Sequence, residues 1–418
     1  MILTEEYVKD MEISFKSKDR VSVREIPLSP GRQFTLFLAG TLALMLAACG
    51  GGGGEGGGGG GGGDVVAQCT LTDSQKDNLT PDDVASLPPE CAFLAAPPLV
   101  GLFILGTETD ALGNLKLYVH GVKQDATPMT LADFQQASVT LDGIDADPAA
   151  TVALAPAGVL SMVMLADYSI SITDADVNGM GDLYDLILNN APEGFEGEVI
   201  NFSTIPPTIS PAITVKPEAP ADHWTEILDG PDGLLAANNY DEEQPRWDTI
   251  LYDAMGTGLM GPLADKFDPT TDKLGLVERN GPLDGEHRPA TLIIVQTDGI
   301  DTASTQLTLA IDNPQPNDVD KLMDRCHTTA IMMGTFQTAI DVDVLEALAE
   351  PRGAFLQALN TNFLQAAIEP YAKSLGNLVV FTLSSDTGFD GKTVRIEVDG
   401  LGRDAVEPFD IDGTCQQL

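Results

Sequence analysis

Oxygen-bearing side chains occur at three separated places in the chain, and their chemistry suits a hard divalent cation. Asp167, Ser169 and Ser171 alternate along one short segment directly after an apolar run. Thr249 precedes a later segment, and Asp298 stands in a Thr-Asp-Gly turn after another apolar run. Carboxylate and hydroxyl oxygens bind Mg²⁺ or Ca²⁺ rather than zinc. Taken alone, a D-x-S-x-S string is weak, because Ser and Asp also crowd ordinary turns.

The segments around these residues predict an open α/β sheet. Three runs are apolar on both faces, as parallel strands between two helix layers are: residues 159–165, 291–295 and 328–334. Apolar residues at helical spacing occur in three segments, 251–263, 345–349 and 363–371. Pro370 is expected to kink the last helix or to end its regular part. Strands alternating with helices form open α/β sheets, which bind ligands at the carboxyl ends of their strands, where Asp167 and Asp298 would lie.

Two flanking regions, residues 93–155 and 376–418, carry shorter alternating runs. Turn signals such as Asp142-Gly143 and Asp390-Gly391 separate the runs, so both regions predict β-hairpins. Neither region alone is large enough for a stable sheet with two covered faces. We therefore predict one β-sandwich built from both regions, flanking a central domain at residues 156–375.

The central segments resemble the von Willebrand factor type A family. Its metal-ion-dependent adhesion site combines D-x-S-x-S, a threonine before a Leu-Tyr-Asp-Ala-like helix, and an aspartate in a Thr-Asp-Gly turn. These elements occur here in the same order, and the match spans about residues 156–375. The resemblance implies a Rossmann-like sheet and a Mg²⁺ ion, or Ca²⁺ or Mn²⁺ in its place, held by Asp167, Ser169, Ser171, Thr249 and Asp298. The family usually has glycine at the position of Ile170, and the extra side chain would stand beside the metal.

Binding rather than catalysis is the function that this resemblance implies. One coordination position of the metal stays open in the family, and an acidic side chain of a partner protein fills it. The alternative is an envelope scaffold or assembly protein whose type A domain is degenerate and independent of metal. An enzyme is not expected, since none of the histidines stands in a nucleophile or zinc motif: His120, His223, His287 and His327.

A second metal candidate overlaps the first. Oxygen side chains occupy positions 1, 3, 5, 9 and 12 of a segment that has Gly179 at position 6, namely Asp174, Asp176, Asn178, Asp182 and Asp185. This is the spacing of an EF-hand or dockerin calcium loop. A second Ca²⁺ is therefore one interpretation, and an acidic loop leading into a helix at residues 183–188 is the other.

The N-terminal region predicts export and a lipid anchor. Residues 34–48 are apolar or small, too short a run to span a bilayer but suited to a signal peptide at residues 1–48. The run ends in Leu-Ala-Ala-Cys49, which resembles the lipobox of bacterial lipoproteins and implies a lipid on Cys49. A plain secretory signal with a chance cysteine is the alternative. Gly50 after the cysteine favours the outer membrane over the inner, and the envelope is the expected location.

Residues 49–92 form the predicted connection to the folded part. Residues 50–63 are glycine except for Glu55, which gives a flexible tether rather than a phosphate-binding loop. Cysteines beyond the anchor are expected to form disulfides outside the cytoplasm, and three pairings are open for Cys69, Cys91, Cys326 and Cys415. Proximity in sequence favours Cys69–Cys91, which leaves Cys326–Cys415.

The charge of the chain excludes one class of partner. The sequence has 22 Lys and Arg against 63 Asp and Glu, a formal net charge of −41. Such a surface repels nucleic acid and anionic lipid headgroups, so contact with the membrane is expected through the lipid anchor only. Adaptation to a salty habitat is as good an interpretation of this charge as calcium binding.

Overall fold

A computed structural model describes the greater part of the chain beyond residue 78. The described residues are 79–84, 97–167, 169, 174–202, 208–209, 213–214, 249–260, 288–297, 301, 304, 306–308, 311–312, 328–335, 341–349 and 352–405. All of them belong to one compact unit, residues 69–418. The predicted signal peptide, the anchor at Cys49, the glycine tether and the four other cysteines lie outside the described residues. In the ranges described, no helix combines the length and apolar character that crossing a membrane requires.

Five parallel strands form the central sheet in the spatial order β14-β13-β10-β6-β7. They are β6 (Leu160–Asp167), β7 (Glu196–Phe202), β10 (Ala290–Gln296), β13 (Thr329–Thr335) and β14 (Ala354–Ala358). Two short strands, β8 (Thr208–Ile209) and β9 (Ile213–Thr214), pair antiparallel with β7. In chain order, β6 is the first strand of this sheet, β7 is added on one side of it, and β10 is then added on its other side. The order therefore reverses between β6 and β10, which is the topological switch point of a doubly wound sheet.

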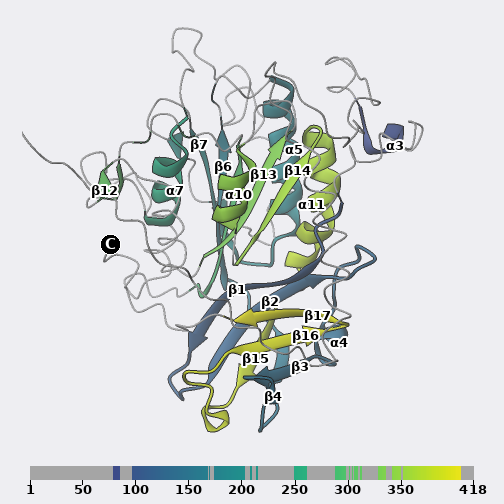
Figure 1. Cartoon of the computed structure of the whole chain (residues 1–418), viewed down its shortest axis with the longest axis vertical. Helices are drawn as coiled ribbons and strands as arrows, with labels where there is room; N and C mark the ends of the chain where they lie inside the picture. The colour runs from purple at the N-terminus through teal and green to yellow at the C-terminus, as the bar shows by residue number, and fades with distance from the viewer. Residues whose placement is uncertain are drawn as a thin grey trace, which may run out of the picture. The chain divides into compact units, whose positions relative to one another are not determined.

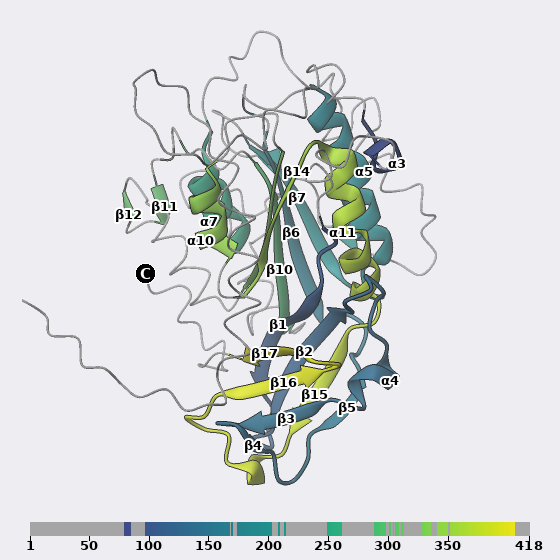
Figure 2. The same ribbon diagram turned by 45° about the vertical axis from the view of Figure 1, so that its right-hand side comes forward.

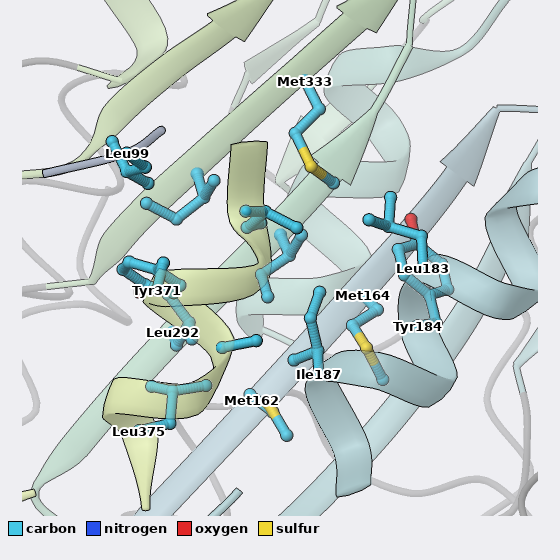
Figure 3. Packing of buried hydrophobic residues seen from close by; sticks show 14 of the residues in the cluster. Leu99, Met162, Met164, Leu183, Tyr184, Ile187, Leu292, Met333, Tyr371 and Leu375 are labelled. Atoms are coloured by element: carbon cyan, nitrogen blue, oxygen red, sulfur yellow. The ribbon is translucent and has the colours of Figure 1, made fainter. Parts of the chain in front are cut away.

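Helices cover both faces of this sheet, as its apolar strands require (Figures 1 and 2). Along β6, Met162 and Met164 face one helix layer, whereas Val163 and Leu165 face the other. The first layer consists of α5 (Asp174–Asn190) and α11 (Thr361–Leu375), and the second of α7 (Leu251–Met260) and α10 (Val342–Ala349). Figure 3 shows the first layer packed on the strands, with Leu183, Tyr184 and Ile187 of α5 close to Met164. The predicted α/β sheet is confirmed.

Pro370 does not end helix α11, which was one of its two expected effects. The helix continues through the proline to Leu375, and Tyr371 and Leu375 are both fully buried. Packing of this face onto the sheet outweighs the hydrogen bond that proline cannot make. Asn360 caps the start of the helix, where its side chain accepts a bond from Phe363 N at 3.3 Å.

A β-sandwich lies beside the α/β part and is built from both flanking regions, as predicted. One sheet has the order β1-β2-β15-β5 and the other β17-β16-β3-β4. The strands are β1 (Gly101–Thr109), β2 (Leu115–Val122), β3 (Ser138–Leu141), β4 (Ile144–Asp145), β5 (Thr151–Leu154), β15 (Val379–Leu383), β16 (Val394–Val398) and β17 (Leu401–Ala405). One apolar core joins the two sheets, with Leu117 and Phe381 from the first and Val394 and Ile396 from the second. The remaining short elements are α3 (Pro81–Val84), α4 (Leu131–Phe134), β11 (Gln306–Thr308), β12 (Ile311–Asp312) and the 3₁₀ turn η4 (Ser385–Thr387).

The sandwich packs against the α/β part through β1 and β2. Phe103 and Tyr118 belong to the same core cluster as α11. Thr329 of β13 donates its hydroxyl to the carbonyl of Ile104 at 2.8 Å. Gly106, at an irregularity in β1, lies so close to the carbonyl of Pro289 that a Cβ would overlap it. These contacts join the sandwich to both α11 and the amino ends of the central strands.

Candidate functional site

Asp167 is the last residue of β6, and its carboxylate is fully buried. One oxygen, Oδ1, accepts a hydrogen bond from the backbone N–H of Ser169 at 2.8 Å. The other, Oδ2, accepts from the hydroxyl of Thr297 at 2.6 Å, although the two residues are 130 positions apart. Since Thr297 directly follows β10, this carboxylate joins the carboxyl ends of the two strands on either side of the switch point.

Thr297 is the residue of this site that sequence reasoning missed. It is part of the Thr-Asp-Gly turn, but it is not among the five ligands that the sequence predicts. Its backbone N–H donates to Met333 O at 3.0 Å, so the main chain here is fixed to β13 while the side chain orients Asp167. A signal did exist in the sequence: Thr297 continues the alternation of Ile293 and Val295, which face the same helix layer as Leu165.

Thr249 lies just before α7 and is only 4% exposed. The start of α7 contacts the loop that follows β10. Tyr252 N donates to Asp301 Oδ2 at 2.9 Å, and Asp253 N donates to Ser304 Oγ at 3.0 Å. These bonds bring the segment that carries Thr249 to the same edge of the sheet as Thr297 and Asp167.

Of the five predicted ligands, the structure therefore places three. Asp167 and Ser169 adjoin one another at the end of β6, and Ser169 is buried as well. Thr249 begins a segment that is bonded to the neighbouring loop. Ser171 and Asp298 lie outside the described residues.

Two buried phenols lie near this edge of the sheet. Tyr184 of α5 donates its hydroxyl to Leu165 O at 2.5 Å; burial raises the pKa of Tyr184, and the Asp167 carboxylate raises it further. Burial, followed by the carboxylates of Asp301 and Asp341, raises the pKa of Tyr252 to about 12. Burial is the larger cause at both phenols, and the nearby carboxylates act in the same direction.

The donor groups at the end of β6 fit a hard cation. All of them are oxygens, namely the Asp167 carboxylate and the hydroxyls of Ser169 and Thr297. Within the described residues, no three His, Cys, Asp or Glu side chains come together as a metal site. A cation at this edge would therefore depend on hydroxyls together with carboxylates, which suits Mg²⁺, Ca²⁺ or Mn²⁺ better than zinc.

The predicted calcium loop does not form. Residues 174–185, with Asp174, Asp176, Asn178, Asp182 and Asp185, are the first turns of the continuous helix α5. An EF-hand loop must turn around its ion, which a regular helix backbone cannot do. Gly179, interpreted as the turn glycine, is instead the place where α5 meets α11: a Cβ there would overlap the Thr361 side chain. Close packing of two helices explains this glycine.

The strand order, the two helix layers and the oxygen cluster at the switch point define the class of the α/β part. It is an open, doubly wound domain of the kind that the resemblance to the von Willebrand factor type A family implied. Its candidate ligand site lies where such sheets bind their ligands, between β6 and β10.

Comparison with known proteins adds structural neighbours. No protein-family profile and no curated protein sequence matches the chain. Similar solved structures include the ArnB paralog VWA2 from Sulfolobus acidocaldarius, with 12% identity and a TM-score of 0.31 over 66% of this chain and 54% of that chain. A von Willebrand factor type A structure from Catenulispora acidiphila has 12% identity and a TM-score of 0.32 over 68% and 51%. Manganese-loaded TRAP protein from Plasmodium vivax has 12% identity and a TM-score of 0.29 over 62% and 83%. This chain thus spans about half the length of the first two.

Proposed function

We propose that this protein is an envelope-anchored binding protein that holds a divalent cation between β6 and β10. The cation would be ligated by Asp167, Ser169, Ser171, Thr249 and Asp298. Its open coordination position would take a Glu or Asp side chain of a partner protein. The observation that carries the proposal is the buried Asp167 carboxylate, oriented by two hydrogen bonds at the switch point of the sheet.

Burial of this carboxylate supports a role in binding a cation. An ionised carboxylate away from water is costly unless it is paired, hydrogen-bonded or bound to a metal. Two hydrogen bonds orient this carboxylate, one from a backbone N–H and one from a threonine hydroxyl, and both donors are neutral. A cation would supply the opposite charge, and the hydroxyls of Ser169 and Thr249, both buried, are hard ligands for it.

The net charge of the chain explains why an acidic partner group would need the cation. At a formal −41, the protein repels a free carboxylate at long range. A bound Mg²⁺ reverses the sign of the potential at one point of the surface, and its direct bond to the partner oxygen replaces repulsion with attraction. Binding would then depend on the divalent cation and not on a broad complementary surface.

Direct measurement of Mn²⁺ binding to the full chain tests the metal site. Free Mn²⁺ is counted by electron paramagnetic resonance for the unaltered chain, Asp167→Asn, Thr249→Val and a matched control, Asp182→Asn. Asp182 is exposed on α5, so this control removes one negative charge outside the site. We expect one Mn²⁺ site, displaced by Mg²⁺, that weakens by about 10- to 100-fold in the two site variants and stays unchanged in the control. Equal Mn²⁺ binding by the unaltered chain and Asp167→Asn would refute a cation site at Asp167, and no binding by the unaltered chain would favour the metal-independent scaffold.

Paired peptides test the partner chemistry. An array of peptides, each present in a Glu and a Gln version, is probed with the full chain in Mg²⁺ and in EDTA. The proposal expects peptides that bind only in the Glu version and only in Mg²⁺. Binding that is indifferent to EDTA would refute a cation-mediated contact.

The location of the protein is part of the proposal. A lipid on Cys49 would hold the chain in the outer membrane, with residues 50–63 as its tether, and the disulfides Cys69–Cys91 and Cys326–Cys415 would form after export. Metabolic labelling with a fatty-acid probe should mark the unaltered chain and not Cys49→Ala. Non-reducing peptide mapping should recover the two disulfide pairs, and a labelled Cys49→Ala chain would refute the anchor.

A further inference from the structure

The start of helix α7 has an unusual source of hydrogen-bond acceptors. The first N–H groups of a helix have no partner within the helix, and a Ser, Thr, Asp or Asn directly before it normally supplies one. Here the preceding residue is Ile250, whose side chain accepts nothing. The acceptors come instead from about fifty positions further along, where Asp301 binds Tyr252 N and Ser304 binds Asp253 N.

Asp301 and Ser304, which we name the α7 clamp, are also bonded to each other. Ser304 donates its hydroxyl to Asp301 Oδ2 at 2.5 Å and its backbone N–H to Asp301 Oδ1 at 3.1 Å. Both carboxylate oxygens are therefore engaged, one of them by the helix and by Ser304 together. A carboxylate at a helix N-terminus is also favoured by the helix dipole. The clamp is thus a small, connected network rather than a single exposed contact.

The clamp joins two parts of the proposed cation site. It belongs to the loop that begins at Thr297, whose hydroxyl orients Asp167 and whose next residue is Asp298. The helix that it caps begins directly after the segment with Thr249. The same loop therefore bonds to β6 at one end and to α7 at the other, and the candidate ligands come from all three segments.

We propose that Asp301 and Ser304 are positioning residues that fix Thr249 relative to Asp167, so that the site is assembled before the cation arrives. This inference rests on the proposed function, because it assigns the clamp a role toward that same cation. Asp301 acts through α7 and not as a ligand. Outer groups that orient the ligands of a metal change its affinity by about 10- to 100-fold when they are lost, which sets the size of the effect.

The test compares Mn²⁺ affinity of the full chain among four variants. Asp301→Ala removes the acceptor for α7, whereas Asp301→Asn keeps an acceptor oxygen and loses the charge. Ser304→Ala removes the second acceptor. The matched control is Asp341→Ala, because Asp341 accepts from Val344 N at 3.2 Å at the start of α10 and also lies near Tyr252. It removes a helix cap and a negative charge from the same region without touching the clamp.

We expect Mn²⁺ binding to weaken about tenfold or more in Asp301→Ala and by a smaller factor in Ser304→Ala. Asp301→Asn and Asp341→Ala should stay within about threefold of the unaltered chain, since each keeps the bond to Tyr252. Hydrogen exchange at the amides of Tyr252 and Asp253 gives a readout independent of metal: it should accelerate in Asp301→Ala and not in Asp341→Ala.

Each adverse outcome has a separate meaning. Unchanged Mn²⁺ affinity in Asp301→Ala, with faster exchange in α7, would overturn the positioning role and leave the cation site standing. Equal weakening in Asp301→Asn and Asp301→Ala would mean that Asp301 acts by charge or ligation, which also overturns it. No Mn²⁺ binding by the unaltered chain would overturn the proposed function and this inference together. Should Asp301→Ala fail to fold, Ser304→Ala and Asp301→Asn still decide the question.

Discussion

Substitution of His120 should reduce the loss of stability of the fold between pH 7 and pH 5. His120 lies on β2, fully buried against α11, and its Nδ1 is 2.6 Å from Ser374 Oγ. Because the Ser374 hydroxyl donates to Tyr371 O at 2.7 Å, the proton in the bond to histidine is on Nδ1. Among the described residues Nε2 has no hydrogen-bond partner. Phe103 and Tyr371 enclose the ring, with centroids 5.3 and 4.7 Å from it.

The magnitude follows from the cost of charging this ring. Burial lowers the pKa of His120 from 6.5 to about 3. Between these two values the unfolded chain binds one proton more than the folded chain, so the free energy of unfolding falls as the pH falls. At about 1.4 kcal/mol per pH unit, the loss accumulates over the roughly 1.5 units between pH 6.5 and pH 5 and reaches about 2 kcal/mol from this residue alone.

Urea unfolding at pH 7 and pH 5 measures the effect, with His120→Phe as the variant. Phenylalanine keeps an aromatic ring beside Phe103 and Tyr371 but cannot take up a proton. Every carboxylate titrates in both proteins, so its contribution cancels in the difference between their pH dependences. The unaltered chain should lose about 2 kcal/mol more than His120→Phe over this range. The same pH dependence in both proteins would show that His120 is not buried in its neutral form.

Three further predictions concern packing and the site. Thr297→Val removes the hydroxyl that donates to the buried Asp167 carboxylate and should lower the free energy of unfolding by about 1.5–3 kcal/mol. Thr297→Ser keeps a hydroxyl and should retain most of the stability of the unaltered chain. Equal stability of the valine and serine variants in urea would contradict this bond. Gly179→Ala should lower the free energy of unfolding by about 1–3 kcal/mol because the new methyl group overlaps Thr361, even though alanine is the better helix former. A higher melting temperature would refute the close contact of α5 and α11. Phe381→Ala should lower the free energy of unfolding, measured in urea, by about 3–5 kcal/mol because the ring is fully buried between the two sheets of the sandwich. A decrease below about 1 kcal/mol would argue against the shared core.

The fold could be predicted where the apolar pattern admits a single structure. Residues 159–165 are apolar at every position except Ser161, a pattern typical of a strand covered on both faces, and β6 is such a strand. The sandwich could be predicted because neither flanking region suffices alone, and β15 indeed pairs with both β2 and β5. In both cases the reason is burial of apolar surface, which the sequence shows directly.

The prediction of a calcium loop was wrong because a calcium loop and a helix can both have this spacing of polar residues. Polar side chains at positions 1, 3, 5, 9 and 12 with a glycine suit a calcium loop, but the same residues are also compatible with a continuous helix. The deciding signal was the apolar set: Met180, Leu183, Tyr184 and Ile187 recur at helical spacing and are all fully buried. That set begins inside the supposed loop, and burying it against the sheet favours a helix from Met180 onward; the observed helix starts earlier, at Asp174.

The order of strands is what brings the candidate site together, and no local pattern contains it. Asp167 and Thr297 meet across 130 positions only because β10 is added beside β6 and not beside β7. The cap of α7 depends on the same arrangement, since Asp301 reaches Tyr252 only when the loop after β10 lies next to the start of that helix. Sequence motifs supply the oxygen ligands one segment at a time. These ligands share one edge of the sheet because β6 and β10 are adjacent strands. A change that shifts either strand should therefore displace Asp167, Thr297 and α7 together.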